Sequence, residues 1–174
     1  MKARENKGIT MVTLVITIIV LLIIAGIGIY SGTGTIKKAK LEELKTNMLL
    51  IQAKAKEYVE NANFKLGTKI DDAQETERDD RIGKAKAELK GEEIEKSDIS
   101  DIIREKEEDE GNYIYYYKLT EEQLKEIGLS DVKSSTQNGE YIVEYDIKKA
   151  QVEIYHTKGY NGKYSLTDIE EIKE

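Results

Sequence analysis

The stretch from Lys7 to Gly34, KGITMVTLVITIIVLLIIAGIGIYSGTG, decides the fold because it contains the longest apolar run of the chain. From Ile9 to Tyr30 there are 22 residues without a charge. As a helix this run is about 33 Å long, enough to cross a hydrocarbon core of about 30 Å. A secretory signal peptide has a shorter apolar region, of about 7 to 15 residues, before a small-residue cleavage site. We therefore expect a transmembrane helix over residues 9–30.

The eight residues before this run form a short charged leader, which ends in Lys7-Gly8 and meets the apolar run directly at Ile9. This layout resembles the class III signal of type IV pilins and of the pseudopilins of type II secretion. The resemblance is specific over the first 30 residues and extends to the rest only in architecture. It implies that a prepilin peptidase cuts after Gly8 and that Ile9, the new N-terminus, is N-methylated.

The chain departs from the family at the fifth mature position, where the usual glutamate is replaced by Thr13. In the family that carboxylate is thought to pair with the N-terminal amine of a neighbouring subunit. Threonine accepts a hydrogen bond but carries no charge, and burying an unpaired ammonium costs several kcal/mol. Thr10, Thr13 and Thr17 share one face, although helix threonines mostly bond their own preceding carbonyls. The departure favours a minor subunit or a subfamily with different packing.

The spine helix of the family implies that the apolar helix continues, here to about Asn63. Residues 31–65 fit an amphipathic continuation, because apolar residues recur at spacings of three and four. These are Leu41, Leu44, Met48, Ile51, Ala55, Tyr58 and Ala62. Glycine costs about 1 kcal/mol inside a helix, so a flexible joint is expected at Gly26, Gly28, Gly32 and Gly34.

Residues 66–112 are highly charged and correspond to the variable insert of pilin-like proteins. Over residues 85–111 we expect one or two short helices, with Ser97-Asp98 or Ser100-Asp101 as candidate caps. A modest apolar face is expected from the isoleucines Ile94, Ile99, Ile102 and Ile103.

Residues 113–174 change period and predict a small antiparallel sheet with a short helix. The aromatic run NYIYYYKLT is typical of a strand, and Thr120 with Gln123 forms a capping box for a helix that ends at Gly128. Two further strands are expected at about residues 140–147 and 151–157, followed by an edge strand and a closing helical turn. The predicted fold is α+β, with the long helix packed on the sheet.

Composition and chemistry-bearing residues indicate no enzyme and no cofactor. The net charge of −7 offers no electrostatic footprint for nucleic acid, and the absence of cysteine excludes thiolate metal sites. The lone His156 is expected to decorate the surface, and solvated charge explains the acidic residues of 71–80, which lack the pattern of a calcium loop. These are Asp71, Asp72, Glu75, Glu77, Asp79 and Asp80. Packing is expected of the tyrosines Tyr113, Tyr115, Tyr116 and Tyr117.

We therefore expect a structural prepilin-like subunit that is assembled into a type IV pilus or a pseudopilus. Its partners would be the plasma membrane, the prepilin peptidase and other pilin-like subunits, with most of the chain extracellular. The alternative is an uncleaved, single-pass signal-anchored membrane protein whose outer domain binds a ligand or the cell wall. An uncut leader would favour this alternative.

Overall fold

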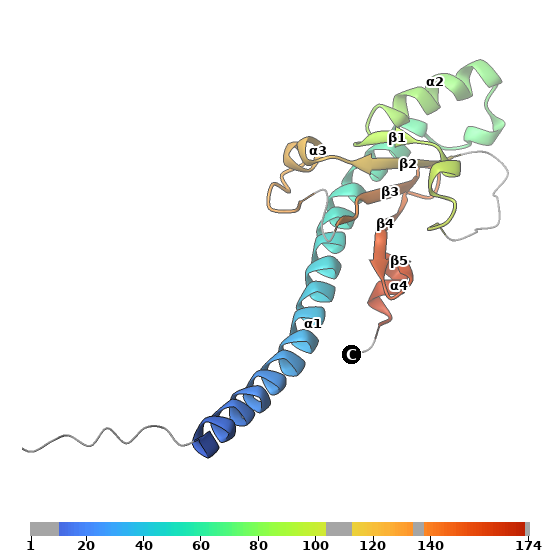
Figure 1. Cartoon of the computed structure of the whole chain (residues 1–174). Coiled ribbons are helices and arrows are strands. Elements are labelled where there is room, and N and C mark those ends of the chain that lie inside the picture. The colour runs from blue at the N-terminus through green and yellow to red at the C-terminus, as the bar shows by residue number, and fades with distance from the viewer. Residues whose placement is uncertain (1–10, 104–112, 134–137, 173–174) are drawn as a thin grey trace, which may run out of the picture. The chain divides into compact units, whose positions relative to one another are not determined.

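The computed structural model describes the backbone of residues 11–103, 113–133 and 138–172, and the side chains of these ranges from residue 35 onward (Figure 1). The chain divides into two compact units, residues 1–40 and residues 41–174. Helix α1, Met11–Leu66, begins in the first unit and ends in the second. All other described elements belong to the second unit.

The predicted amphipathic stripe of α1 is confirmed from Leu41 onward, where it forms one side of the main core. Six of its seven members are buried, and Tyr58 is half-buried against the same cluster next to the buried Val59. The helix ends at Leu66 because Gly67 adopts a φ of 73°, in the left-handed region. The Gly67 N–H then donates to the Asn63 carbonyl at 3.0 Å, which closes the last turn.

The described strands form one antiparallel sheet in the order β1-β2-β3-β4-β5, so each strand lies beside its neighbours in sequence. Their bounds are β1 Glu92–Ile94, β2 Ile114–Leu119, β3 Tyr141–Asp146, β4 Gln151–Tyr160 and β5 Lys163–Ser165. The central strand β3 pairs over its whole length with both β2 and β4. The α+β class and the long helix packed on an antiparallel sheet are thus as predicted.

Alternation along β3 divides the core between the two faces of the sheet. Tyr141, Val143 and Tyr145 belong to the main cluster, which packs against α1. Ile142 belongs to a smaller cluster on the opposite face, with the buried residues Ile99, Tyr116 and Tyr155. The predicted isoleucine face is confirmed here, since Ile94, Ile102 and Ile103 pack against this second cluster.

One or two short helices were expected over residues 85–111, but part of this segment is a strand. Residues 92–94 form strand β1, which pairs with β2 in the register Glu93↔Tyr117. Strand β1 has no apolar alternation that would predict a strand. It is a short edge strand, and pairing with β2 sets its conformation. The cap predictions were also wrong: the 3-10 helix η2, Lys96–Ile99, begins after Glu95. Residues 104–112 of the insert lie outside the described residues.

The insert instead contains helix α2 at Glu75–Lys86, preceded by the 3-10 helix η1 at Ile70–Asp72. Four of the acidic residues expected to be solvated charge lie in α2, namely Glu75, Glu77, Asp79 and Asp80. Glu75 and Glu77 favour its first turn, and Glu77 and Asp80 form ion pairs. The buried Ala85 and the half-buried Ile82 attach α2 to the main core.

The elements after β2 follow the sequence closely. Helix α3, Glu121–Glu126, begins with the predicted capping box, in which the Thr120 hydroxyl accepts from the Gln123 N–H. Strand β4 is longer than expected and continues to Tyr160. The edge strand and closing helical turn are β5 and α4, Leu166–Glu170.

In the part of the chain whose side chains are described, no helix is long and apolar enough to cross a membrane. The apolar run of residues 9–30 lies outside that part. Its membrane-spanning character therefore stays a prediction.

Candidate assembly surface

The side of α1 that faces away from the sheet exposes large apolar side chains. Leu49 is 43% exposed, Leu50 is 44% exposed and Phe64 is 82% exposed, whereas Met48 and Ile51 beside them are fully buried. At 100° per residue Leu50 and Phe64 differ by about 40° around the helix, so they lie on the same side. We call Leu49, Leu50 and Phe64 the outer apolar residues of α1.

Sequence reasoning missed these residues because it followed the buried stripe alone. Leu49 and Leu50 lie between Met48 and Ile51 in sequence but are turned away from them on the helix surface. The signal in the sequence was that Leu49 and Leu50 do not belong to the apolar stripe, which by itself supplies enough residues for the core. Phe64, the only phenylalanine of the chain, lies within the predicted helical segment 31–65 but outside its apolar stripe.

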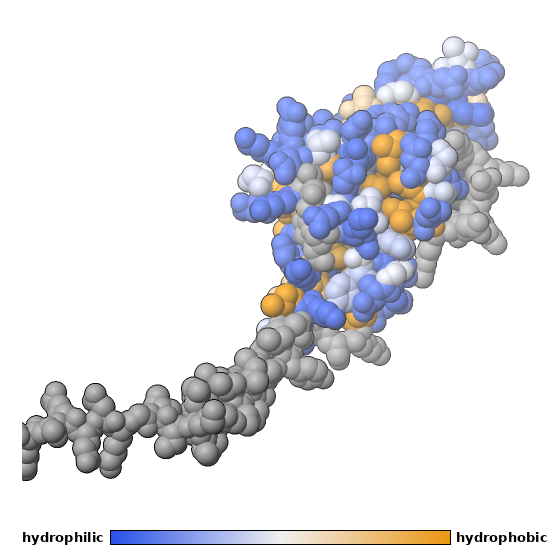
Figure 2. All heavy atoms as spheres, in the orientation of Figure 1, coloured by the Kyte–Doolittle hydropathy of each residue, from blue (hydrophilic) through white to orange (hydrophobic). Residues whose placement is uncertain are grey.

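Charged residues surround the outer apolar residues and pair locally along the helix. Lys45 lies 3.6 Å from Glu42, and Lys54 lies 3.9 Å from Glu57. The Lys45 side chain is only 16% exposed and also donates to the Ile172 carbonyl at 3.5 Å. The exposed Lys54–Glu57 pair contributes little to stability, roughly 0–1 kcal/mol. Over the second unit the surface is largely hydrophilic, with small hydrophobic areas between charged side chains (Figure 2). Small apolar areas of this kind are ordinary on a protein surface.

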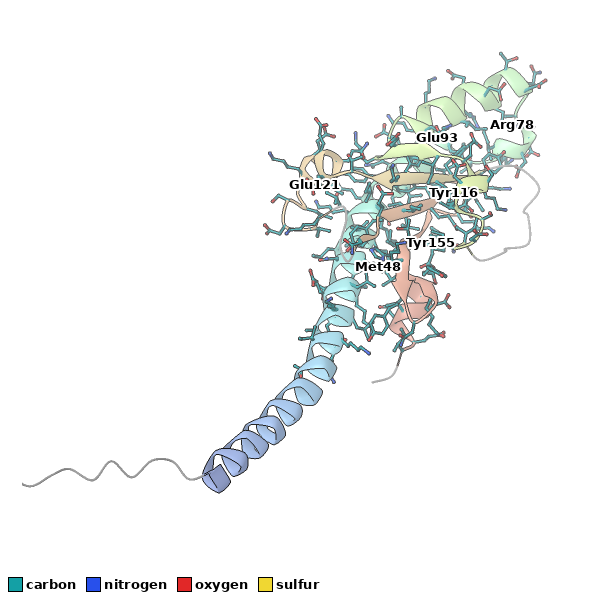
Figure 3. All side chains as sticks on the ribbon, in the orientation of Figure 1. Met48, Arg78, Glu93, Tyr116, Glu121 and Tyr155 are labelled. Carbon is teal, nitrogen blue, oxygen red and sulfur yellow. The ribbon has the colours of Figure 1, made fainter. Side chains whose placement is uncertain are left out.

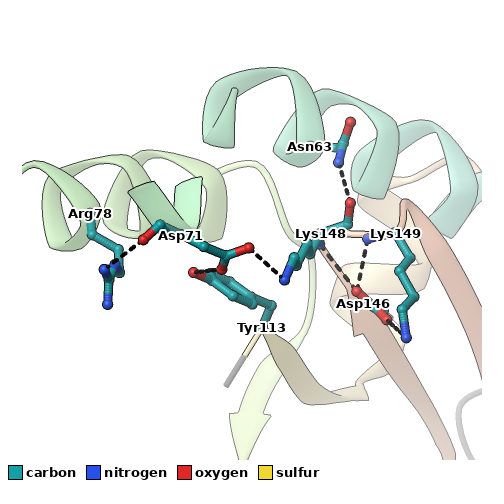
Figure 4. A network of polar contacts seen from close by, with 7 residues as sticks. All are labelled: Asn63, Asp71, Arg78, Tyr113, Asp146, Lys148 and Lys149. Atoms are coloured by element: carbon teal, nitrogen blue, oxygen red, sulfur yellow. Dashed lines mark hydrogen bonds and ion pairs between the residues drawn. The ribbon is translucent and has the colours of Figure 1, made fainter. Parts of the chain in front are cut away.

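A polar network at the end of α1 ties the helix to the β3–β4 turn (Figure 4). The Asn63 side-chain amide donates to the carbonyls of Ile147 and Lys148, at 2.9 and 2.8 Å. In the turn itself, the Asp146 carboxylate accepts from the backbone N–H groups of Lys148 and Lys149, at 3.1 and 2.9 Å. Two otherwise open carbonyls and two open N–H groups of the turn are thereby satisfied.

The same network reaches the insert through Asp71 of η1. The Asp71 carboxylate accepts from the Lys148 ammonium at 2.9 Å and from the Tyr113 hydroxyl at 3.1 Å. The Lys148 bond, helped by Tyr113 and Arg78, holds the pKa of Asp71 below its usual range. Arg78 of α2 donates to the carbonyls of Asp71 and Ala73, which fixes the start of the insert. Helix, hairpin and insert are thus bonded at one point.

The tyrosines of β2 and Tyr113 just before it serve packing, as expected, on both faces of the sheet. Tyr113, Tyr116 and Tyr117 are buried and Tyr115 is half-buried. The Tyr117 ring meets that of Tyr145 edge to face at 5.6 Å, and burial raises the pKa of Tyr117 to about 12. On the other face the Tyr155 hydroxyl donates to the buried Glu144 carboxylate at 3.0 Å. This bond satisfies a charge that would be costly to bury alone.

The prediction that His156 decorates the surface was wrong, because its side chain is fully buried. It lies opposite Tyr141 in the β3–β4 ladder, and the two ring centroids are 5.2 Å apart. Its Nδ1 atom accepts from the Gly159 N–H at 3.1 Å. Burial of this histidine is accompanied by a hydrogen bond at Nδ1 and by ring packing against Tyr141. The residue is part of the core.

The acidic residues of 71–80 remain largely on the surface, and Asp71, Glu77 and Asp80 are paired with cations of their own chain. Asp80 bonds Lys84 at 2.6 Å, and Glu77 bonds Arg81 at 2.9 Å. Among the described residues, no group of three or more histidines or carboxylates is arranged to hold a metal ion.

The predicted sites near the N-terminus fall where side chains are not described. Gly8 and Ile9 lie outside the described residues. Thr13 and the glycines 26, 28, 32 and 34 lie within α1, and their roles in assembly and as a joint stay predictions. Comparison with protein-family models, curated proteins and solved structures found no match.

Proposed function

We propose that this chain is a prepilin-like structural subunit, held in the plasma membrane by residues 9–30 and then assembled into an extracellular filament. A prepilin peptidase removes residues 1–8, and the new N-terminal Ile9 is methylated. The second unit, residues 41–174, then lies outside the membrane and forms the surface of the filament.

One observation carries this proposal: the two sides of α1 in the second unit differ in what they bury. One side packs on the sheet through Leu44, Met48 and Ile51, while the other leaves Leu49 and Leu50 exposed. A helix needed only to support the sheet would gain nothing from exposed leucines. In a helix that also contacts neighbouring subunits, the same leucines would bury apolar surface between the two chains.

The network at Asn63 supports the same function. Its hydrogen bonds attach the C-terminal end of α1 directly to the β3–β4 hairpin. Apolar residues upstream of this attachment then bury surface between subunits, which is a mechanical role that needs no catalytic group. The replacement of the family glutamate by Thr13 favours a minor subunit.

The experiment that tests this proposal is to determine the mass and N-terminal sequence of the protein from its native membrane. A chain that begins at Ile9, about 14 Da heavier for a methyl group, is the expected result. A Gly8→Val variant should keep its leader, whereas Ala3→Val, in the same leader, should still be cut. A wild-type chain that retains residues 1–8 would overturn the proposal and favour the signal-anchored membrane protein.

A further inference from the structure

Three exposed lysines lie on α1 shortly after the apolar run. Lys37, Lys38 and Lys40 are all exposed, and we call them the lysine triplet. Ile36, which precedes them, is 56% exposed, so an apolar side chain borders the triplet on the side of the apolar run. Between Asn6 and Leu41 the sequence contains no aspartate or glutamate. The triplet is therefore a local concentration of positive charge.

The charge of the chain is distributed unevenly. Residues 1–40 contain six lysines and arginines and one glutamate, a net charge of +5, whereas the remaining residues carry a net charge of −12. Outside the leader, the triplet supplies all the basic side chains of residues 1–40. An anionic surface repels a strongly acidic domain and attracts a basic segment. Such a surface is therefore expected to contact the chain at the triplet.

The position of the triplet along α1 matches the edge of a bilayer that contains residues 9–30. The helix is continuous from Met11 to Leu66, and Lys37 and Lys40 follow Tyr30 by seven and ten residues. These separations correspond to about 10 and 15 Å along the helix axis. The head-group region of a bilayer extends about 5–8 Å beyond the hydrocarbon core on each side.

The direction of helical side chains brings the ammonium groups closer to the head groups. In an α-helix the Cα–Cβ bonds tilt towards the N-terminus, which here is the direction of the apolar run. Long lysine side chains also lay their methylene groups along apolar surface while the charged end stays among polar groups. The ammonium groups of the triplet are thus expected at the level of the lipid phosphates.

The triplet covers a wide arc of the helix. At 100° per residue, Lys37, Lys38 and Lys40 are spread over about 160° of the circumference. Transmembrane helices are tilted by about 20° on average, which brings one side of the emerging helix nearer to the head groups. With lysines over nearly half of the circumference, several rotations of a tilted helix leave an ammonium group facing the lipids.

The residue type fits a phosphate of variable position. Lysine has a compact charge with three donors on a flexible stem, whereas arginine has a rigid, planar fork. A mobile lipid phosphate needs no fixed fork geometry. The triplet is therefore suited to select lipids by negative charge and not by the shape of the head group.

We infer that the lysine triplet binds the phosphates of anionic phospholipids in the leaflet from which the second unit emerges. The inference rests on the proposed function, because residues 9–30 must lie in the bilayer. A subunit that leaves the bilayer for a filament must break these ion pairs. The anionic lipid content of the membrane then sets how readily the subunit is extracted.

The test measures lipid preference with the full-length chain in phosphatidylcholine bilayers. Spin-labelled phosphatidylglycerol and spin-labelled phosphatidylcholine are compared by electron paramagnetic resonance, which reports the fraction of each lipid in contact with the protein. Each lysine near an anionic group gives roughly a fivefold preference. Averaged over all lipids around the helix, phosphatidylglycerol should be favoured about twofold. This preference should disappear in 1 M salt, which screens charges beyond about 3 Å.

The test variant combines Lys37→Gln, Lys38→Gln and Lys40→Gln, and its preference for phosphatidylglycerol should fall. The matched control combines Lys56→Gln, Lys65→Gln and Lys69→Gln, three exposed lysines of the second unit, and makes the same change in net charge. The control should keep the wild-type preference. The leader is the same in every variant, so the difference between variants reports the triplet. Equal preference in the test variant and the wild type, or a preference that persists in 1 M salt, would overturn the inference.

Alkaline carbonate extraction and filament counts by electron microscopy separate this inference from the proposed function. A chain that carbonate releases from the bilayer would overturn both. An inserted chain without lipid preference would overturn the lipid contact alone. A test variant that keeps its lipid preference but forms fewer filaments would assign the triplet to a contact between subunits and overturn the lipid contact. A triplet-dependent preference in a chain that never forms filaments would support the lipid contact and overturn the proposed function.

Discussion

The imidazole of His156 fills the space beside Gly139, where a Cβ atom would lie 2.4 Å from the histidine Cε1. Both residues are buried, and the ring is held from the other side by Tyr141. Glycine is therefore required at position 139 because the side chain of His156, on strand β4, leaves no room for a Cβ atom. The contact between Gly139 and His156 positions the residues just before β3 against strand β4.

This contact predicts a non-additive pair of substitutions. Gly139→Ala should cost about 1–3 kcal/mol, because the added methyl group overpacks the site. His156→Ala should also destabilise, since it leaves a cavity and removes the acceptor for the Gly159 N–H. In the double variant the alanine methyl occupies space vacated by the ring, so the total loss should be smaller than the sum. Urea unfolding of the full-length chain in detergent measures all three, and strict additivity would contradict the contact.

The two sides of α1 should respond differently to substitution. Met48→Ala, on the buried side, should lower the free energy of unfolding by about 2–5 kcal/mol. Leu50→Gln, on the exposed side, should change it by less than about 0.5 kcal/mol but should reduce filament number. Figure 3 shows Met48 on the side of α1 that faces the sheet. Paired unfolding curves and electron microscopy provide the measurement. Normal filaments in Leu50→Gln and Leu49→Gln together would exclude the outer apolar residues from assembly.

Stability should fall at alkaline pH because of the buried tyrosines. Burial raises the pKa of Tyr117 to about 12 and raises that of Tyr145 as well. The folded chain therefore keeps protons that the unfolded chain loses above about pH 10, and this contribution to stability disappears as the pH rises towards 12. Urea midpoints between pH 8 and pH 11.5, with absorbance at 295 nm, follow the effect. The slope should be shallower in Tyr117→Phe.

Asp71 should contribute the opposite dependence at acid pH. Its pKa is lowered chiefly by the hydrogen bond from Lys148, so its contribution to stability is present above about pH 4 and is lost as the pH falls below that value. Asp71→Asn should remove this part of the acid sensitivity. Lys148→Met, which deletes the partner, should remove the same part. An acid titration that is unchanged in both variants would show that the contact is not maintained in solution.

The sequence predicted the elements whose signals are local. The apolar stripe from Leu41 to Ala62 has helical spacing, and the side chains of β3 alternate between the two faces of the sheet. The capping box of α3 spans only four residues, Thr120 to Gln123. Each of these patterns reports burial or hydrogen bonding that is decided by near neighbours. They were sufficient for the α+β class and for the position of the helix against the sheet.

The features that were missed depend on distant partners. Strand β1 is a strand only because β2 lies beside it, and His156 is buried only because Gly139 makes room for its ring. The outer apolar residues of α1 became visible once the structure showed which side of the helix the sheet covers. No local pattern distinguishes a leucine that completes the core from one that is left for another molecule.

The amide of Asn63 has a mechanical consequence for a chain that is pulled by its N-terminal helix. Because the Asn63 amide is hydrogen-bonded to the Ile147 and Lys148 carbonyls of the β3–β4 turn, a pulling force along α1 is transmitted to the middle strands of the sheet. Strand β3 is bonded along its whole length on both sides, so the load is shared as shear among many backbone bonds. The short outer strands β1 and β5 each pair with one neighbour only, so they have fewer backbone bonds to share this load. In a domain anchored in this way, the outer strands can separate from the sheet while the central strands still carry the force.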